Sequence, residues 1–312
     1  MHIFKYKKKG GINLKDEYSI VSMLPVRFRE ICHNMVNLKE LEEIRLRVNS
    51  PIMFYDRNGE ISEKGNELTV KDSDIKETIE YISGYSLYAY EDEIKEGFLT
   101  IRGGHRIGLA GKVVLEKGRI KNLTNISSIN IRISHEINNI ARPVASYIFE
   151  NGIKSVLIIS SPGIGKTTFL RDLIRTGSDD YRKKIAIVDE RSEIASSYMG
   201  KPTNDIGKRT DVLDGCPKDM GILMALRALS PDIIAVDELG GSRDLECVNK
   251  AFNCGVNIFA TIHAGNIKEL QEKEGFEQII KNKSFKSYVV LKKTHGTRSV
   301  ELYDEALCRV NI

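Results

Sequence analysis

The second half of the chain alternates short apolar runs with segments whose apolar residues recur at helical spacing. Residues 156–159 form the first apolar run, with the length and composition of a buried parallel strand. A loop with two glycines follows, and residues 169–174 then carry apolar side chains on one helical face. The same patterns predict strands at 185–188, 233–236 and 258–262 and helices at 220–229 and 245–252. Such alternation predicts a mainly parallel sheet with helices between its strands.

The first half of the chain follows a different pattern. Residues 43–48 alternate between apolar and charged side chains, which predicts a half-buried strand. Helices are predicted at 16–34 (interrupted near Pro25), 72–84 and 87–94, and short strands at 98–101, 107–115, 119–123 and 129–133. Two or three antiparallel strands are predicted near the end, at 288–310. The sequence therefore predicts a smaller α+β amino-terminal domain at 1–140 and an α/β domain at 141–312.

Length, charge and cysteine content narrow the classes of function. The 312 residues are enough for two domains with their own cores. The net charge of +4 comes from 47 basic and 43 acidic residues, a balance that argues against stable nucleic-acid binding. The five cysteines include no C-x-x-C pair, which favours a reduced, cytoplasmic protein and argues against a zinc site. No apolar run approaches ~20 residues, so we expect no transmembrane segment.

Residues 160–167 read SSPGIGKT and join the first parallel strand to the helix after it. Strand, glycine-containing loop and helix in this order are the setting of a phosphate-binding loop, the Walker A motif. The glycines let backbone N–H groups face phosphate oxygens, and the helix N-terminus faces the same anion. Lys166 would contact the β- and γ-phosphates, and Thr167 would offer its hydroxyl to Mg²⁺. The predicted ligands are ATP and Mg²⁺, and the predicted nucleotide-binding residues are Pro162, Gly163, Ile164, Gly165, Lys166, Thr167 and Thr168.

Ser160 departs from the usual phosphate-loop pattern, which has glycine at this position. Because the position lies at the end of the strand, serine can replace glycine there if its φ is negative. The alternative to a nucleotide site is an ordinary turn between strand and helix that contains an incidental lysine.

Three more predicted strands end in polar residues. Asp189-Glu190, Asp237-Glu238 and His263 each follow directly after an apolar run. Taken singly, an acidic pair is usually a helix cap or a solvated loop, and a lone histidine is usually structural. The carboxyl ends of parallel strands meet at one edge of a sheet, where ligands bind. We therefore expect these residues to gather around the phosphate loop.

Phosphoryl transfer to water requires charge neutralisation and a group that positions the water. Thr167 and Asp237 carry the hard oxygen atoms that Mg²⁺ prefers. Glu190 and Glu238 both qualify as the group that orients or deprotonates the water, and the sequence does not choose between them. His263 is expected to donate a hydrogen bond near the γ-phosphate.

Four segments together resemble the type II/type IV secretion ATPases. They are the phosphate loop and the strings AIVDERSEI (186–194), LRALSPDIIAVDELG (226–240) and ATIHAG (260–265), in the order seen in that family. The strings GGHRIGLAGKV (103–113) and RTDVLDGCPK (209–218) are more similar still to a branch of the family that acts in sporulation. The resemblance implies a RecA-like P-loop ATPase domain behind the amino-terminal domain. It also implies a ring of subunits, which we expect to be a hexamer.

The resemblance also implies roles for particular residues. The general base proposed for the family lies in the acidic box, which favours Glu190. The Walker B strand of this chain ends in Asp237-Glu238 where the family often has Gly-Glu, so Glu238 remains a second candidate. Family members also supply arginines from the amino-terminal domain to the phosphates. The candidates are Arg132 first, then Arg102 and Arg106, and Arg209 across a subunit boundary. The alternative role of each arginine is a surface ion pair worth under about 1 kcal/mol.

The resemblance further implies membrane partners. It suggests a motor on the mother-cell side that docks on membrane proteins of the sporulation channel complex and energises a secretion-like channel between mother cell and forespore. Two other functions remain open: an ATP-gated assembly scaffold with little turnover, and a RecA-like nucleic-acid translocase. The translocase would need a basic groove with stacking aromatic residues, and the chain has no tryptophan.

Overall fold

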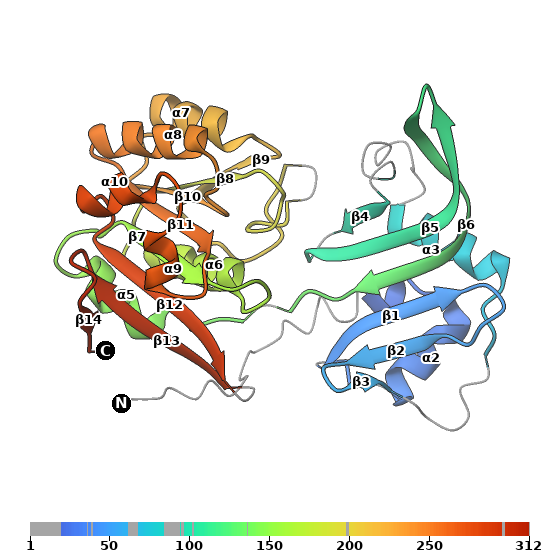
Figure 1. Ribbon diagram of the computed structural model, residues 1–312. Coiled ribbons are helices and arrows are strands. Elements are labelled where there is room, and N and C mark those ends of the chain that lie inside the picture. Colours follow the sequence, from blue (N-terminus) through green and yellow to red (C-terminus); the bar gives the residue numbers. More distant parts are fainter. Residues whose placement is uncertain are drawn as a thin grey trace. The chain divides into compact units, whose positions relative to one another are not determined.

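The computed structural model in Figure 1 contains two compact units, one within Gly11–His135 and one within Glu136–Ile312. Each unit has its own β-sheet. The structure describes residues 20–35, 37–38, 40–61, 68–83, 94, 97–101, 103–135, 137–197, 200–294 and 297–311. Within these ranges, none of the helices is both long and apolar enough to cross a lipid bilayer.

The amino-terminal unit is built on a six-stranded antiparallel sheet in the order β3-β2-β1-β6-β5-β4. The strands are β1 (Leu41–Arg47), β2 (Met53–Asp56), β3 (Gly59–Glu60), β4 (Phe98–Ile101), β5 (His105–Glu116) and β6 (Arg119–Arg132), and the helices are α2 (Val26–Met35) and α3 (Asp72–Ser83). Ile75, Ile79 and Ile82 form the buried face of α3. The sheet and helices confirm the α+β class of this half of the chain.

β6 differs from its predicted form. We predicted two strands, at 119–123 and 129–133, but the structure has one continuous strand that pairs with β5 along most of its length. The polar run between the two predicted strands lacks alternation, and a bulge on β6, where residues 125–127 lie opposite Gly111 of β5, absorbs the irregularity. Gly111 allows the bulge because a Cβ there would lie 2.7 Å from the carbonyl oxygen of Thr124. Of the helix predicted at 87–94, only Ile94 lies within the described residues.

The carboxyl-terminal unit has an eight-stranded sheet in the order β14-β13-β12-β7-β11-β10-β8-β9. The strands are β7 (Val156–Ser160), β8 (Ile185–Asp189), β9 (Thr210–Asp214), β10 (Ile233–Val236), β11 (Asn257–His263), β12 (Ser287–Thr294), β13 (Thr297–Asp304) and β14 (Arg309–Val310). The six strands from β12 to β9 in this order are parallel, β13 is antiparallel to β12, and β14 is antiparallel to β13. The predicted mainly parallel sheet is thus confirmed. β12 differs in part from the prediction for the end of the chain, because it is parallel to β7 as well as antiparallel to β13.

Helices cover both faces of this sheet (Figure 1). They are α5 (Arg142–Phe149), α6 (Lys166–Asp179), α7 (Lys218–Ala228), α8 (Ser242–Asn253), α9 (Ile267–Gln271) and α10 (Phe276–Lys281). Successive residues of β7 point to opposite faces. Ile158 therefore packs in one cluster with Phe169 of α6, whereas Leu157 packs in the other with Val248 of α8. Burial on both faces explains why the central strands are apolar throughout.

The register of the parallel strands brings their carboxyl ends to one edge of the sheet. Val236 of β10 is level with Val188 of β8 and with Ala260 of β11. His263 of β11 is in turn level with Ser160 of β7. The residues that follow these strands therefore emerge together, and the candidate site is built there.

Candidate nucleotide site

The phosphate loop joins β7 to α6, and its conformation depends on two glycines. Gly163 has φ 74° and Gly165 has φ 110°, values that L-residues with side chains rarely adopt. A Cβ at either glycine would meet no other atom within 4 Å, so the backbone conformation and not the space requires glycine. Ser160 is fully buried at the end of β7 and stays outside the left-handed region, and its hydroxyl donates to the carbonyl of Ser161 at 2.9 Å. Serine is thus compatible with the loop conformation at this position.

Lys166, the first residue of α6, is buried, with 6% of its surface exposed. Its Nζ lies 2.8 Å from Nδ1 of His263 and donates to the carbonyl of Ser160 at 3.3 Å. Burial lowers the pKa of Lys166, and the charges of Asp237 and Glu238 oppose this shift. The ammonium is therefore poorly compensated in its present surroundings, and an anion at the loop would stabilise it.

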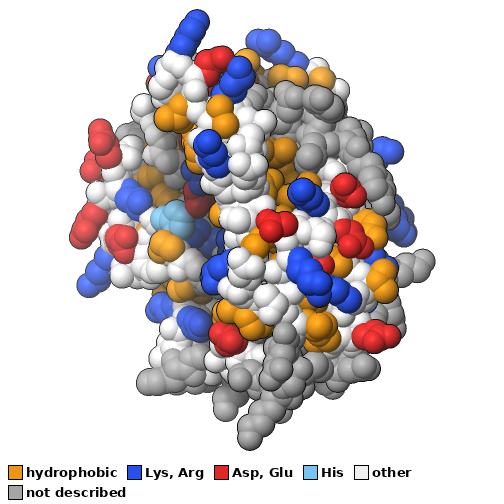
Figure 2. All heavy atoms as spheres, turned by 90° about the vertical axis from the view of Figure 1, so that its right-hand side faces the viewer, with side chains coloured by type: hydrophobic (Ala, Val, Ile, Leu, Met, Phe, Trp, Pro, Cys, Tyr) orange, Lys and Arg blue, Asp and Glu red, His pale blue; other side chains and the backbone are white. Residues whose placement is uncertain are grey.

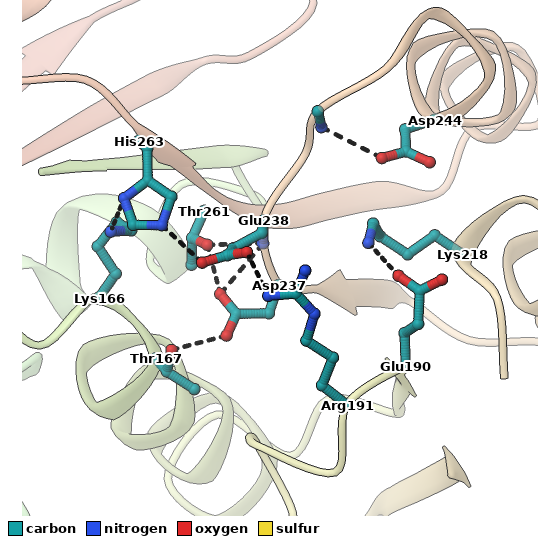
Figure 3. Close-up of polar contacts among 11 residues, drawn as sticks. Lys166, Thr167, Glu190, Arg191, Lys218, Asp237, Glu238, Asp244, Thr261 and His263 are labelled. Carbon is teal, nitrogen blue, oxygen red and sulfur yellow. Dashed lines mark hydrogen bonds and ion pairs between the residues drawn. The ribbon is translucent and has the colours of Figure 1, made fainter. Parts of the chain in front are cut away.

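His263 links Lys166 to Glu238 (Figure 3). An ammonium group only donates hydrogen bonds, so Nδ1 of His263 accepts and the ring proton lies on Nε2. Nε2 then donates to Oε1 of Glu238 at 2.6 Å. The three side chains come from α6, from β11 and from the loop after β10, and they form one continuous chain of polar contacts.

Asp237 is held on both carboxylate oxygens. Thr167 donates its hydroxyl to Oδ2 at 2.6 Å, and Thr261 donates to Oδ1. Thr261 also accepts the backbone N–H of Glu238 at 2.8 Å, which fixes the start of the loop after β10. A hydroxyl and a carboxylate at this separation form a hard-oxygen pair suited to Mg²⁺, which keeps several waters and phosphate oxygens as its other ligands. In the described part of the chain, no group of three His, Cys, Asp or Glu side chains could hold a metal ion by itself.

Glu238 has an unusual backbone and two side-chain partners. Its φ is 51°, in the left-handed region that residues other than glycine rarely occupy, and such backbone strain is frequent at functional sites. Its Oε2 accepts from Arg191 at 2.9 Å, while Oε1 contacts His263. Burial acts to raise the pKa of Glu238, but the hydrogen bond from His263 and the charge of Arg191 outweigh it and lower the pKa below its ordinary value. Glu238 is therefore ionised at neutral pH.

The two acidic residues after β8 have different surroundings. Asp189 is 1% exposed, and its carboxylate accepts the backbone N–H groups of Glu193, Ile194 and Ala195 at 2.8 to 3.0 Å. Burial raises the pKa of Asp189, and these hydrogen bonds oppose the shift. Glu190 instead forms an ion pair with Lys218 of α7, to the right of Asp237 and Glu238 in Figure 3. Asp189 thus organises the loop, and only Glu190 is directed to a neighbouring helix.

The predicted arginines lie elsewhere in the chain. Arg132 is exposed at the end of β6, and Arg106 lies on the neighbouring β5 with its guanidinium over the ring of Phe98. Arg102 falls outside the described residues. Arg209 donates to the carbonyl of Ser178 at 2.9 Å. None of these described contacts involves the phosphate loop.

Two residues of the cluster were not singled out from the sequence. Arg191 is the cation that the structure places on Glu238, and Thr261 is the hydroxyl that orients Asp237. Arg191 directly follows Asp189-Glu190, so its position after a strand end is a signal that could have identified it. Thr261 lies inside an apolar strand, and its role depends on Asp237, which follows the neighbouring strand β10.

The parallel sheet, the phosphate loop and the preceding α+β unit define a P-loop ATPase fold of the secretion-ATPase kind. The ATPase DotB of Legionella pneumophila superposes with a TM-score of 0.56 at 15% identity, over 98% of this chain and 84% of that one. The pilus retraction motor PilT, solved with bound ADP, superposes with a TM-score of 0.59 at 15% identity, over 88% and 81%. At this level of identity the comparison concerns the fold alone.

The chain belongs to the family of sporulation stage III, protein AA, which matches residues 14–310. Stage III sporulation protein AA of Bacillus subtilis is 38% identical over 271 residues, which cover 85% of this chain and 87% of that protein. A more distant relative is the protein SEEDLING PLASTID DEVELOPMENT 1 of Arabidopsis thaliana, 29% identical over 58% of this chain and 24% of that protein.

Proposed function

We propose that this protein is a Mg²⁺-dependent ATPase whose site lies at the carboxyl edge of the parallel sheet. The observation that carries the proposal is the chain of contacts from Lys166 through His263 to Glu238, beside the pair formed by Thr167 and Asp237. A buried lysine, a hydroxyl and two carboxylates around a glycine loop match the requirements of phosphoryl transfer.

In the proposed mechanism the phosphate loop and Lys166 bind the triphosphate. Backbone N–H groups of residues 163–166 and the positive end of α6 would face the phosphate oxygens. Lys166 would exchange its contact with His263 for one with the β- and γ-phosphates, which relieves the unfavourable burial of its charge. Thr167 and Asp237 would hold Mg²⁺, whose chemistry is the neutralisation of charge on these phosphates.

We propose Glu238 as the residue that orients the attacking water. It follows Asp237 directly and is ionised, and its hydrogen bond to His263 connects it to the lysine that would sense the γ-phosphate. Glu190 is the alternative, and its ion pair with Lys218 would have to break before it could act. Glu238 is likewise held in an ion pair, with Arg191. Release of that pair would be a condition for turnover.

We further propose that the ATPase works as a ring, which we expect to be a hexamer, and that it energises a secretion-like channel in sporulation. The fold shared with DotB and PilT and the sporulation family support this proposal. Arg132, Arg106 or Arg102 of the amino-terminal unit, or Arg209 of a neighbouring subunit, would complete the site. A true arginine finger is worth ~10³–10⁵ in rate, so we expect slow hydrolysis by the isolated chain. Docking on membrane proteins of the channel would place the protein at the mother-cell side.

A comparison of Glu238→Gln with Glu190→Gln tests the proposal. Glu238→Gln keeps the shape of the side chain but removes its charge, so we expect ATP binding to persist in calorimetric titration while phosphate release falls about 100-fold or more. Glu190→Gln should retain most of the wild-type rate. The reverse result would assign the water to Glu190, and wild-type turnover in both variants would refute a carboxylate-assisted hydrolysis at this edge. Hydrolysis absent from the wild type as well, with ATP still promoting assembly, would favour the scaffold.

A further inference from the structure

The β5–β6 hairpin continues beyond the sheet to which it belongs. β4 pairs with β5 only from His105 to Gly108, and β1 pairs with β6 only from Ser128 to Arg132. Residues 112–124 therefore pair only within the hairpin, which extends past the neighbouring strands in Figure 1. Lys117 (φ 51°) and Gly118 (φ 76°) form its two-residue turn.

One face of this free hairpin is apolar and exposed. Val113 is opposite Leu123 and Leu115 is opposite Ile120, and residues two apart on one strand share a face. These four residues therefore form one surface, here called the hairpin face. Leu115 is 63% exposed, Ile120 48% and Val113 47%, which places three of the exposed large hydrophobic residues of the described chain on this element. Single exposed apolar residues are ordinary, but a contiguous set on an extended arm indicates a binding surface.

Basic residues accompany the hairpin face. The tip, residues 112–121, carries three lysines and one arginine (Lys112, Lys117, Arg119 and Lys121) against a single acidic residue, Glu116. A local surplus of three positive charges contrasts with a net charge of +4 for all 312 residues. Figure 2 shows Lys and Arg side chains and hydrophobic side chains next to one another near the top of the face drawn.

We propose that the tip of the β5–β6 hairpin binds directly to the surface of an anionic lipid bilayer. Leu115, Ile120 and Val113 would enter the interface between headgroups and acyl chains, and the lysines would contact the headgroups. The composition favours a bilayer over a protein partner, because protein interfaces are enriched in aromatic residues and depleted in lysine, whereas residues 105–132 contain no aromatic residue. Insertion must be shallow, since the outer edges of the two strands keep unpaired backbone groups. This contact is independent of the nucleotide site.

Co-sedimentation of the full chain with vesicles tests the proposal. We expect binding to vesicles of phosphatidylcholine with phosphatidylglycerol, weaker binding at high salt, and little binding to phosphatidylcholine alone. Leu115→Ser with Ile120→Ser should weaken the binding at unchanged charge. Replacing Lys112 and Lys121 by Gln and Lys117 by Asn should lower the partition coefficient on the order of a hundredfold.

A matched control variant removes three lysine charges from the carboxyl-terminal unit instead of the hairpin. Lys268, Lys281 and Lys283 are exposed, and Lys283 has φ 52°, close to that of Lys117. Lys268→Gln, Lys281→Gln and Lys283→Asn combined should leave vesicle binding near the wild-type value, and circular dichroism should report an unchanged fold for every variant. Equal losses of vesicle binding in the two triple lysine variants would overturn the proposal. Unchanged vesicle binding in the variant with Leu115→Ser and Ile120→Ser would overturn it as well. If the hairpin variants changed in molecular mass by light scattering but bound vesicles like the wild type, the proposal would also be overturned. The hairpin would then be assigned to contact with a second copy of the chain.

Discussion

Lys166 and His263 are 97 positions apart in the sequence, yet Nζ of the lysine lies 2.8 Å from Nδ1 of the histidine. The contact exists because β11 is inserted next to β7 in the sheet and ends level with it. His263 therefore lies between the residue that would bind phosphate and the carboxylate that would position water. This geometry makes the imidazole a candidate link between binding and hydrolysis.

We predict that His263→Ala lowers hydrolysis more than it lowers ATP affinity. Loss of the imidazole leaves Glu238 without its hydrogen bond at 2.6 Å, so the water would be poorly positioned. The expected reduction in kcat is roughly 10- to 100-fold, with a change in ATP dissociation constant of a few-fold at most. Phosphate release and calorimetric titration measure the two quantities. A variant that binds ATP as poorly as it hydrolyses it would indicate that His263 acts on binding alone.

Thr167 provides a test of the proposed metal pair. Thr167→Ala removes the hydroxyl that lies 2.6 Å from Asp237, whereas Thr167→Ser keeps it. We expect Thr167→Ala to need on the order of tenfold more Mg²⁺ for half-maximal hydrolysis, because one of the two hard-oxygen ligands is lost. Thr167→Ser should restore the wild-type Mg²⁺ dependence. Identical Mg²⁺ curves for the Ala and Ser variants would exclude the hydroxyl as a metal ligand.

Asp189 and Glu190 should differ in their effects on stability. Asp189→Asn places an amide against three backbone N–H donors, so we expect a loss of about 1–3 kcal/mol in the free energy of unfolding. Glu190→Gln removes a partly exposed ion pair with Lys218 and should cost less than about 1 kcal/mol. Chemical denaturation monitored by circular dichroism compares the two variants. Equal losses would mean that Asp189 does not organise the loop as its hydrogen bonds indicate.

His105 should make the amino-terminal unit sensitive to acid. It is 2% exposed, its Nδ1 accepts the backbone N–H of Ser134 at 3.0 Å, and its Nε2 is buried without a partner. Burial, with a smaller effect of the charge of His135, lowers the pKa of His105 from 6.5 to about 4. Between these values the unfolded chain binds more protons than the folded one, so stability falls as the pH falls.

The magnitude of this acid effect can be bounded. At about 1.4 kcal/mol per pKa unit, protonation of His105 would remove at most about 3 kcal/mol of stability between pH 6.5 and pH 4. Differential scanning calorimetry of the wild type and of His105→Phe, which cannot titrate, measures the contribution. The wild type should lose more stability than the variant over this interval. Parallel pH dependence in the two proteins would contradict a buried neutral histidine.

The parts of the fold that the sequence predicts are those with the strongest burial. β7, β8 and β10 are apolar at nearly every position because helices cover both faces of the sheet. β9 was not predicted because it is the edge strand, and its run TDVLD carries exposed Asp211 and only half-buried apolar residues. Edge strands lack the continuous apolar signal that burial on both faces imposes.

Local patterns in the sequence predicted some members of the cluster but not Arg191 or Thr261, and they predicted none of the contacts between its residues. Strand ends identified Lys166, Asp237 and His263 from local patterns alone. The contact between Lys166 and His263 depends on strand order, and the contact between Arg191 and Glu238 depends on the path of two loops. Neither has a local signature, because both join segments that only the folded sheet brings together.

The most direct test of the central claim is the rate of phosphate release from Mg²⁺·ATP by the wild type and by Lys166→Ala. The site proposed here requires the buried ammonium to bind the β- and γ-phosphates, so the variant should lose hydrolysis by about 100-fold or more and lose ATP binding as well. Lys268→Ala, an exposed lysine of the same unit, should behave as the wild type. Wild-type turnover and wild-type ATP affinity in Lys166→Ala would contradict an ATPase site at this edge of the sheet.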